Sequence, residues 1–189
     1  MLDESASQQG TSPLIDFLDK QLTFDEVKKL SDRAAKGFQL LGVKPGSHVG
    51  LYLPNVPHYI IAFFGILKAG GIVVNYSPLD AERELEHKIE DSETDILVTL
   101  DVAALYPKIA PKLGTTRLKK LIVGSIAYYL PFPKNLLYPL AKKKEISKWP
   151  RDNAHLSFKD LLANDGNYQR HPIAGDLFRC AEGAALLVP

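Results

Sequence analysis

Apolar residues recur every three or four positions near the start of the chain, at Leu22, Phe24, Val27, Leu30, Ala34, Phe38 and Leu41. Residues at this spacing share one face of a helix, so the pattern predicts an amphipathic helix over this segment. Thr23 and Glu26 have the spacing of a capping box at its start, and Gly42 is a typical stop. We therefore expect one helical face to be buried.

Short apolar runs then alternate with helical segments as far as residue 123. Strands are predicted over residues 48–53, 72–74, 95–100 and 119–123. Helices are predicted over residues 58–69, 81–92 and 101–113. Such alternation favours an α/β fold with a mostly parallel sheet flanked by helices.

The remaining segments depart from this alternation. The polar, acidic residues 1–13 are predicted to be a flexible tail in front of an α/β part at 14–124. Residues 125–151 form a basic insertion rich in proline and aromatic residues. Residues 152–189 continue the chain, with one helix turn or a short strand-helix piece at 156–162 and an apolar, strand-like run at 184–188.

Charge is unevenly distributed, although the chain as a whole carries only +1. Between Val102 and Arg151 there are 11 basic residues and a single acidic one, Glu145. Apolar and aromatic residues lie beside these lysines, and three interpretations stay open. The stretch is a surface loop anchored by its apolar residues, a contact with an anionic membrane surface through Lys142, Lys143 and Lys144, or a site for a protein or nucleic acid. The surface loop is the simplest of these, and nucleic acid is disfavoured.

No residue of this chain is predicted to be catalytic, to bind a cofactor or to bind a metal. The phosphate-binding patterns GxxxxGK[ST] and GxGxxG are absent, and the histidines have no metal-binding spacing. The single cysteine, Cys180, excludes an internal disulfide and a multi-cysteine zinc site. There is no export signal and no uninterrupted apolar run of about 18 residues, so we expect a cytoplasmic protein, with peripheral contact at the inner membrane surface as the alternative.

Several segments resemble a known family. They are 22–26, 42–49, 53–55, 64–71, 75–79 and 82–87, reading LTFDE, GVKPGSHV, LPN, FGILKAGG, NYSPL and ERELEH. In this order and spacing they are similar to the N-terminal subdomain of AMP-forming adenylating enzymes, and most similar to long-chain fatty-acid–CoA ligases. The likeness covers about residues 14–123, and the lysine-rich insertion looks like one found in some bacterial members.

The resemblance implies an incomplete N-terminal subdomain of an ATP-dependent acyl-CoA ligase, whose intact members use ATP, Mg²⁺ and coenzyme A. The family's phosphate loop, adenine motif, ribose-binding aspartate and lid lysine are not found in this sequence. We therefore expect a truncated ligase that ends before the phosphate loop, is inactive alone and holds no cofactor. The alternative is a non-catalytic interaction module, either one part of a split ligase whose partner is the missing remainder or a membrane-surface binding protein.

Incomplete cover of the sheet is also expected. The β-branched run at 72–74 is typical of a strand with both faces buried, and relatives complete that cover with later parts of the chain. We therefore predict exposed apolar surface and self-association.

Overall fold

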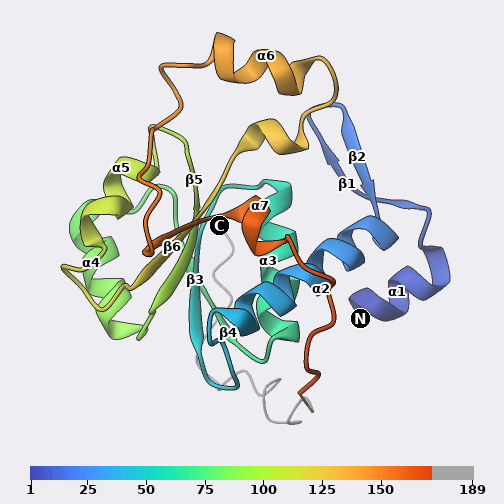
Figure 1. Cartoon of the computed structure of the whole chain (residues 1–189), viewed down its shortest axis with the longest axis horizontal. Helices are drawn as coiled ribbons and strands as arrows, with labels where there is room; N and C mark the ends of the chain where they lie inside the picture. Colours follow the sequence, from blue (N-terminus) through green and yellow to red (C-terminus); the bar gives the residue numbers. More distant parts are fainter. Residues whose placement is uncertain (172–189) are drawn as a thin grey trace.

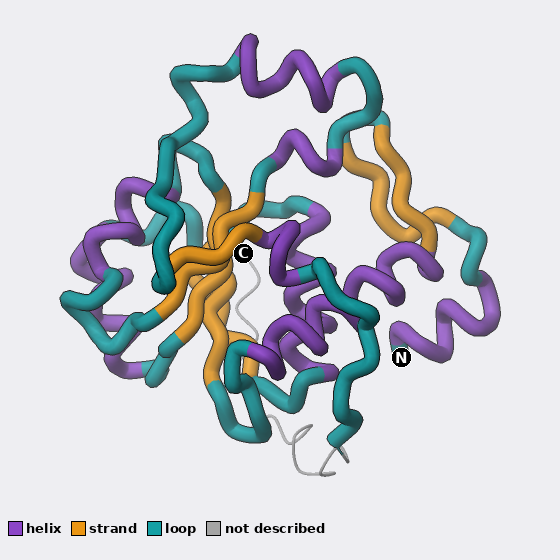
Figure 2. Tube along the Cα trace, in the orientation of Figure 1, coloured by secondary structure: helices purple, strands orange, loops and turns teal. Residues whose placement is uncertain are grey.

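The computed structural model describes residues 1–171 and has a five-stranded parallel sheet at its centre (Figures 1 and 2). Its strands are β3 (His48–Tyr52), β4 (Ile72–Tyr76), β5 (Ile96–Leu100), β6 (Lys120–Gly124) and β7 (His155–Ser157). They lie in the order β4-β3-β5-β6-β7, and every neighbouring pair is parallel. The predicted α/β class with a parallel sheet is confirmed.

Helices cover both faces of this sheet. One face carries α2 (Phe24–Leu40), α3 (Pro57–Lys68) and α7 (Phe158–Leu161), and the other carries α4 (Glu82–Asp91) and α5 (Tyr106–Ile109) (Figure 1). The helix predicted from the first apolar pattern is α2. Its capping box is present, since Thr23 Oγ1 accepts from the backbone of Glu26 at 3.3 Å and Glu26 Oε2 accepts from the backbone of Thr23 at 2.9 Å.

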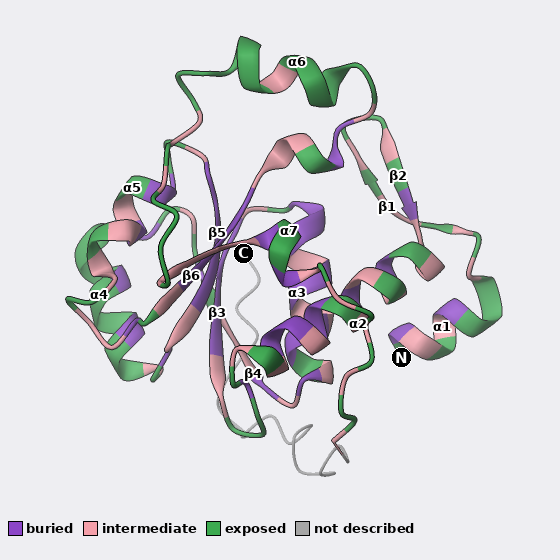
Figure 3. Ribbon diagram, viewed as in Figure 1, coloured by how far each residue is buried: buried purple, intermediate pink, exposed green. Residues whose placement is uncertain are grey.

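The core lies between the sheet and these helices (Figure 3). Fully buried members include Phe38, Leu51, Ile61, Ile66, Leu97 and Leu121. The edge strand β4 is less well covered, because only Tyr76 of its five residues is buried. The incomplete cover predicted for Ile72, Val73 and Val74 is therefore present to the extent that all three are only half-buried.

The prediction of a flexible tail at residues 1–13 is wrong. Residues Leu2–Gln9 form helix α1, which packs on α2 through the buried side chains of Leu2 and Ala6. Lys68 of α3 reinforces the contact, because its Nζ donates to Asp3 of α1 and, at 2.6 Å, to Asp32 of α2. Two apolar residues at i and i+4 are enough to bury one side of this polar helix.

A hairpin precedes α2 and has no counterpart among the predicted elements. Strands β1 (Pro13–Phe17) and β2 (Lys20–Thr23) pair antiparallel around Leu18 and Asp19. Both turn residues have positive φ, at 50° and 72°, a conformation that usually selects Gly or Asn. Without those residues, the sequence carries no recognisable hairpin signal.

Two later predictions have mixed outcomes. The helix expected over 101–113 is shorter, consisting of α5 and the 3₁₀ turn η1 (Ala110–Lys112), because Val102 forms a β-bridge with Ile146 instead. The piece at 156–162 is the end of β7 followed by the single turn α7, as predicted. Cys180 and the run at 184–188 lie outside the described residues.

The basic insertion contains the 3₁₀ turn η2 (Ile126–Tyr129) and helix α6 (Lys134–Ala141). We call residues 131–144 the arm. It rises from the body of the molecule and returns to it, with α6 farthest from the sheet (Figure 1).

Candidate functional site

The topology singles out the carboxyl edge of the sheet. The chain passes from β3 to β4 on one side and then crosses to β5 on the other, so the connections diverge between the ends of β3 and β5. Open parallel sheets bind ligands outside the carboxyl ends of their strands at such a switch point. In this chain the switch point lies between Tyr52, which ends β3, and Asp101, which follows β5.

The turn after β3 has no phosphate cradle. It reads Leu53-Pro54-Asn55-Val56-Pro57 and contains no glycine. Pro57 is the first residue of α3 and has no backbone N–H to offer an anion. The carboxyl edge of β3 therefore has a rigid helix start in the place where nucleotide-binding α/β proteins have a glycine-rich loop.

A buried histidine lies beside the end of β6. His58, in the first turn of α3, packs edge-on against Tyr129 and Phe158, with ring centroids 4.7 and 4.9 Å away. Neither ring nitrogen has a hydrogen-bond partner in residues 1–171. Burial lowers the pKa of His58 to about 3, so the ring is neutral at pH 7. Gly124 is required there, because a Cβ at that position would lie 2.6 Å from the ring.

Two further buried polar groups end neighbouring strands. The Tyr52 hydroxyl and one Asp101 carboxylate oxygen are buried and have no partner within the described chain. Burial raises the pKa of Tyr52, and the negative charges of Asp80 and Glu82 raise it further. Burial also raises the pKa of Asp101. With His58, the carboxyl edge thus carries three buried groups able to form hydrogen bonds, none of which the sequence patterns had identified.

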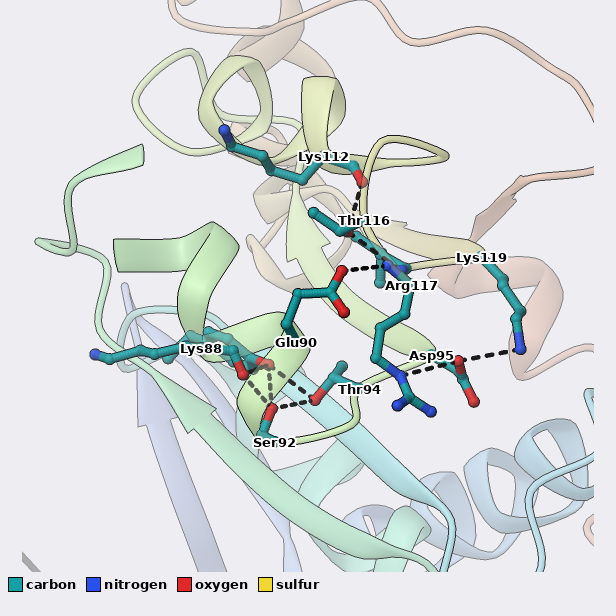
Figure 4. A network of polar contacts seen from close by, with 11 residues as sticks. Lys88, Glu90, Ser92, Thr94, Asp95, Lys112, Thr116, Arg117 and Lys119 are labelled. Carbon is teal, nitrogen blue, oxygen red and sulfur yellow. Dashed lines mark hydrogen bonds and ion pairs between the residues drawn. The ribbon is translucent and has the colours of Figure 1, made fainter. Parts of the chain in front are cut away.

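A pocket of about 460 Å³ lies at the opposite, amino edge of the sheet. Part of its charged lining, centred on Asp95, is paired, as the close view in Figure 4 shows. Asp95 contacts Arg117 Nε at 3.4 Å and Lys119 Nζ at 3.2 Å, and Glu90 accepts from the Arg117 backbone at 2.8 Å. This network ties the residues before β5 to those before β6, and we interpret it as structural.

A smaller pocket, of about 340 Å³, lies beside β7 and contains His155. Its Nδ1 lies 2.8 Å from Asp152 Oδ1, its Nε2 lies 3.0 Å from the Tyr106 hydroxyl, and Trp149 stacks on the ring. The hydrogen bond from His155 lowers the pKa of Asp152. Both ring nitrogens are therefore engaged. No cluster of three or more His, Cys, Asp or Glu that could hold a metal ion occurs in residues 1–171.

The lysines for which membrane contact is one of the three interpretations lie at the end of the arm. Lys142, Lys143 and Lys144 directly follow α6 and are exposed, and Lys142 pairs with Glu145 at 2.6 Å. None of the helices in residues 1–171 has the length and apolar character needed to cross a bilayer.

Comparison with known proteins gives concordant matches. The family model described as AMP-binding enzyme matches residues 2–164. A long-chain-fatty-acid–CoA ligase of Bacillus subtilis is 36% identical over 146 residues, covering 77% of this chain and 26% of the relative. A ligase of the same description from Escherichia coli O157:H7 is 31% identical over 169 residues, covering 87% and 29%. The chain thus spans between a quarter and a third of the length of these two relatives.

Solved structures agree on the fold. Coronafacic acid ligase from Pectobacterium brasiliense superposes with a TM-score of 0.73 over 93% of this chain and 31% of that one, at 15% sequence identity. The sequence match and the fold therefore agree, and the family-model match runs from the start of α1 to beyond the end of α7. The chain belongs to the AMP-binding enzyme family.

Proposed function

We propose that this chain is the N-terminal part of a long-chain fatty-acid–CoA ligase and does not activate fatty acids alone. The carrying observation is the 36% identity to the Bacillus subtilis ligase over 146 residues. In that proposal the carboxylate of a fatty acid would attack the α-phosphate of ATP, releasing pyrophosphate and forming acyl-AMP. The thiol of coenzyme A would then take the acyl group and release AMP.

The chemistry of the carboxyl edge supports the proposal that this chain does not activate fatty acids alone. Adenylation requires groups that neutralise the phosphates of ATP, such as Mg²⁺, lysines or the backbone N–H groups of a glycine-rich loop. The turn after β3 ends in Pro57 and offers no such loop. The phosphate-binding pattern GxxxxGK[ST] is absent from the whole sequence. ATP, Mg²⁺ and coenzyme A would then depend on residues that this chain does not contain.

This chain would contribute a structural framework, namely the parallel sheet and its carboxyl edge. The end of β3, the first turn of α3 and the residue after β5 place the buried groups of Tyr52, His58 and Asp101 at one edge of the sheet. Buried groups of this kind are normally hydrogen-bonded in a complete protein. His58 is enclosed by Tyr129 and Phe158 of this chain, so the assignment of this edge to the contact with the remainder of the ligase is based on Tyr52 and Asp101.

A chimeric enzyme tests the proposal. Residues 2–164 of this chain would replace the matching N-terminal segment of the Bacillus subtilis ligase, and palmitate-dependent release of pyrophosphate and formation of acyl-CoA would be measured. The chimera should be active, whereas the 189-residue chain and the ligase lacking its N-terminal segment should both be inactive. Pyrophosphate release by the 189-residue chain alone would contradict the proposal.

The split-ligase alternative is tested in the same assay. The truncated Bacillus subtilis ligase would be mixed with the separate 189-residue chain instead of being fused to it. Activity only after mixing would support assembly in trans. A folded but inert chimera would show that the framework does not serve a ligase, and would contradict the assignment.

A further inference from the structure

The arm exposes its apolar side chains. No residue of α6 is buried. Leu136 is 67% exposed, Leu140 75% and Phe132, just before the helix, 82%. Exposed leucines are unremarkable when scattered, but a contiguous apolar patch on a protein surface indicates a binding surface.

The helix also turns its polar side toward the protein. Leu136 and Leu140 are four residues apart and share one face, with Leu137 beside them. Lys134 lies on another face and pairs at 2.5 Å with Asp19, in the β1–β2 turn. Tyr138, four residues after Lys134, is half-buried. This orientation is the reverse of a helix that packs its leucines on a core.

Both ends of the arm are fixed. Before it, Tyr129 and Leu130 are buried, with only 7% and 5% of their surface exposed. After it, the backbone of Glu145 accepts from Ala103 at 2.8 Å, and Ser147 donates to Asp101 at 2.6 Å. The exposed leucines are thus held away from the sheet by an anchored segment (Figures 1 and 3).

Positive charge accompanies the leucines. Residues 125–151 contain six basic residues and one acidic residue, Glu145. Lys142, Lys143 and Lys144 follow the apolar helix directly and are exposed. Lysines next to apolar side chains are typical of segments that lie in the headgroup region of a membrane with anionic lipids.

We infer that the arm docks on the surface of an anionic lipid bilayer, with Phe132, Leu136 and Leu140 in the headgroup–acyl boundary and Lys142 to Lys144 on the lipid phosphates. A bilayer satisfies both features, because its headgroup–acyl boundary accepts exposed apolar side chains and its anionic headgroups attract cations. A nucleic acid would satisfy the lysines but leave the leucines in water. The inference concerns binding only and is independent of the proposed ligase activity.

Vesicle flotation of the 189-residue chain tests this docking. The probes are vesicles of phosphatidylcholine with about one-third phosphatidylglycerol, and vesicles of phosphatidylcholine alone. Three lysines near an anionic surface are worth on the order of 100-fold in affinity. We therefore expect binding to the anionic vesicles, and a loss of this order when Lys142, Lys143 and Lys144 are all changed to Gln.

Matched variants distinguish the arm from exposed leucines and lysines elsewhere on the surface. Leu136→Gln with Leu140→Gln should abolish flotation, whereas Leu40→Gln with Leu79→Gln should not, although Leu40 and Leu79 are 69% and 91% exposed. For charge, the control is the triple change of Lys29, Lys44 and Lys159 to Gln, three exposed lysines outside the arm. Circular dichroism would check that each variant is folded.

Depth is measured with a tryptophan on the arm. In the variant Leu137→Trp with Trp149→Phe, fluorescence should be quenched by brominated lipid in anionic vesicles, since Trp149 is the only native tryptophan. Absence of flotation by the folded wild-type chain would overturn the docking. So would equal losses in the arm and control variants, or arm-dependent binding to an oligonucleotide without binding to vesicles.

Discussion

The sheet and the arm use the same residue type in opposite ways. Leu51, Leu97 and Leu121 of the sheet are fully buried, whereas Leu136 and Leu140 of the arm are 67% and 75% exposed. Each sheet leucine lies on a strand that is paired with neighbouring strands and covered by a helix. The arm, in contrast, is attached to the body through its two ends and through polar groups such as Lys134. Leucines therefore stabilise this chain in the sheet and are available for external contacts in the arm.

The largest effect we predict separates these two environments directly. Leu97→Ala should cost about 2–5 kcal/mol of unfolding free energy, because it removes a fully buried side chain and leaves a cavity. Leu136→Ala should change the unfolding free energy by no more than about 0.5 kcal/mol. Urea denaturation followed by circular dichroism measures both values.

An equal loss of unfolding free energy in the two variants would contradict this difference between the sheet and the arm. It would mean that Leu136 is packed in solution and that the arm is part of the core. A loss in Leu97→Ala below about 1 kcal/mol would instead show that the region around β5 collapses onto the cavity.

The sheet could be predicted from the sequence, whereas several segments outside it could not. For the sheet, β-branched and apolar runs between helical patterns were sufficient, and β3, β5 and β6 begin and end within one residue of prediction. These elements bury their own apolar residues, so that local pattern and final environment agree. The β1–β2 hairpin could not be predicted, because Leu18 and Asp19 adopt positive φ without a glycine or asparagine.

Tertiary contacts decided what the local pattern left open. Residues 2–9 look like a tail by composition, and they are ordered by Leu2 and by the ion pair between Asp3 and Lys68, a residue 65 positions away. The buried groups at the carboxyl edge were missed for a similar reason. His58 is buried only because Tyr129 and Phe158 return to cover it, and nothing in its local sequence indicates that return.

The second prediction concerns the attachment of α1 to α2 and α3. Lys68 is only 12% exposed and lies between Asp3 and Asp32, so that Lys68→Met leaves Asp3 without its cation. Asp32 keeps Lys28 at 2.8 Å. We expect a loss of about 1–3 kcal/mol of unfolding free energy, and faster hydrogen exchange in α1.

Lys29→Met is the matched control, because Lys29 is an exposed lysine of α2. It should change the unfolding free energy by less than about 0.5 kcal/mol. Equal effects of the two variants would show that α1 is held by Leu2 and Ala6 alone.

The third prediction concerns pH and tests the burial of His58. The unfolded chain protonates this ring near pH 6.5, whereas the folded chain keeps it neutral down to about pH 3. Its contribution to stability is therefore complete above pH 6.5 and declines as pH falls through that value. Between pH 7.5 and 5.5 this linkage should remove about 1.4 kcal/mol of unfolding free energy.

The variant His58→Leu should lack that component of the acid loss, and urea denaturation at the two pH values measures the difference. The exposed His87 serves as a control, since His87→Leu should keep the pH dependence of the wild-type chain. Identical pH profiles for His58→Leu and the wild-type chain would mean that the ring is solvated.

The smallest expected effect concerns the orientation of the arm. Asp19 and Lys134 are 77% and 57% exposed, so Asp19→Asn should leave the urea midpoint unchanged. The pair lowers the pKa of Asp19, so the tether exists above the carboxyl's unfolded value of 3.8 and is lost as pH falls through the lower folded value. Loss of the tether should speed tryptic cleavage after Lys142 to Lys144 roughly twofold at neutral pH.

Asp16→Asn, in the same hairpin, is the control. Within the described residues, the only side chain that forms a hydrogen bond with the Asp16 carboxylate is Gln21. Added salt should reproduce the effect of Asp19→Asn, since it screens exposed pairs. Unchanged cleavage in Asp19→Asn would mean that α6 is oriented by the buried Tyr129 and Leu130 at its base. In that case the outward position of the leucines would follow from the backbone at the two ends of the arm, and an isolated surface charge would have no part in it.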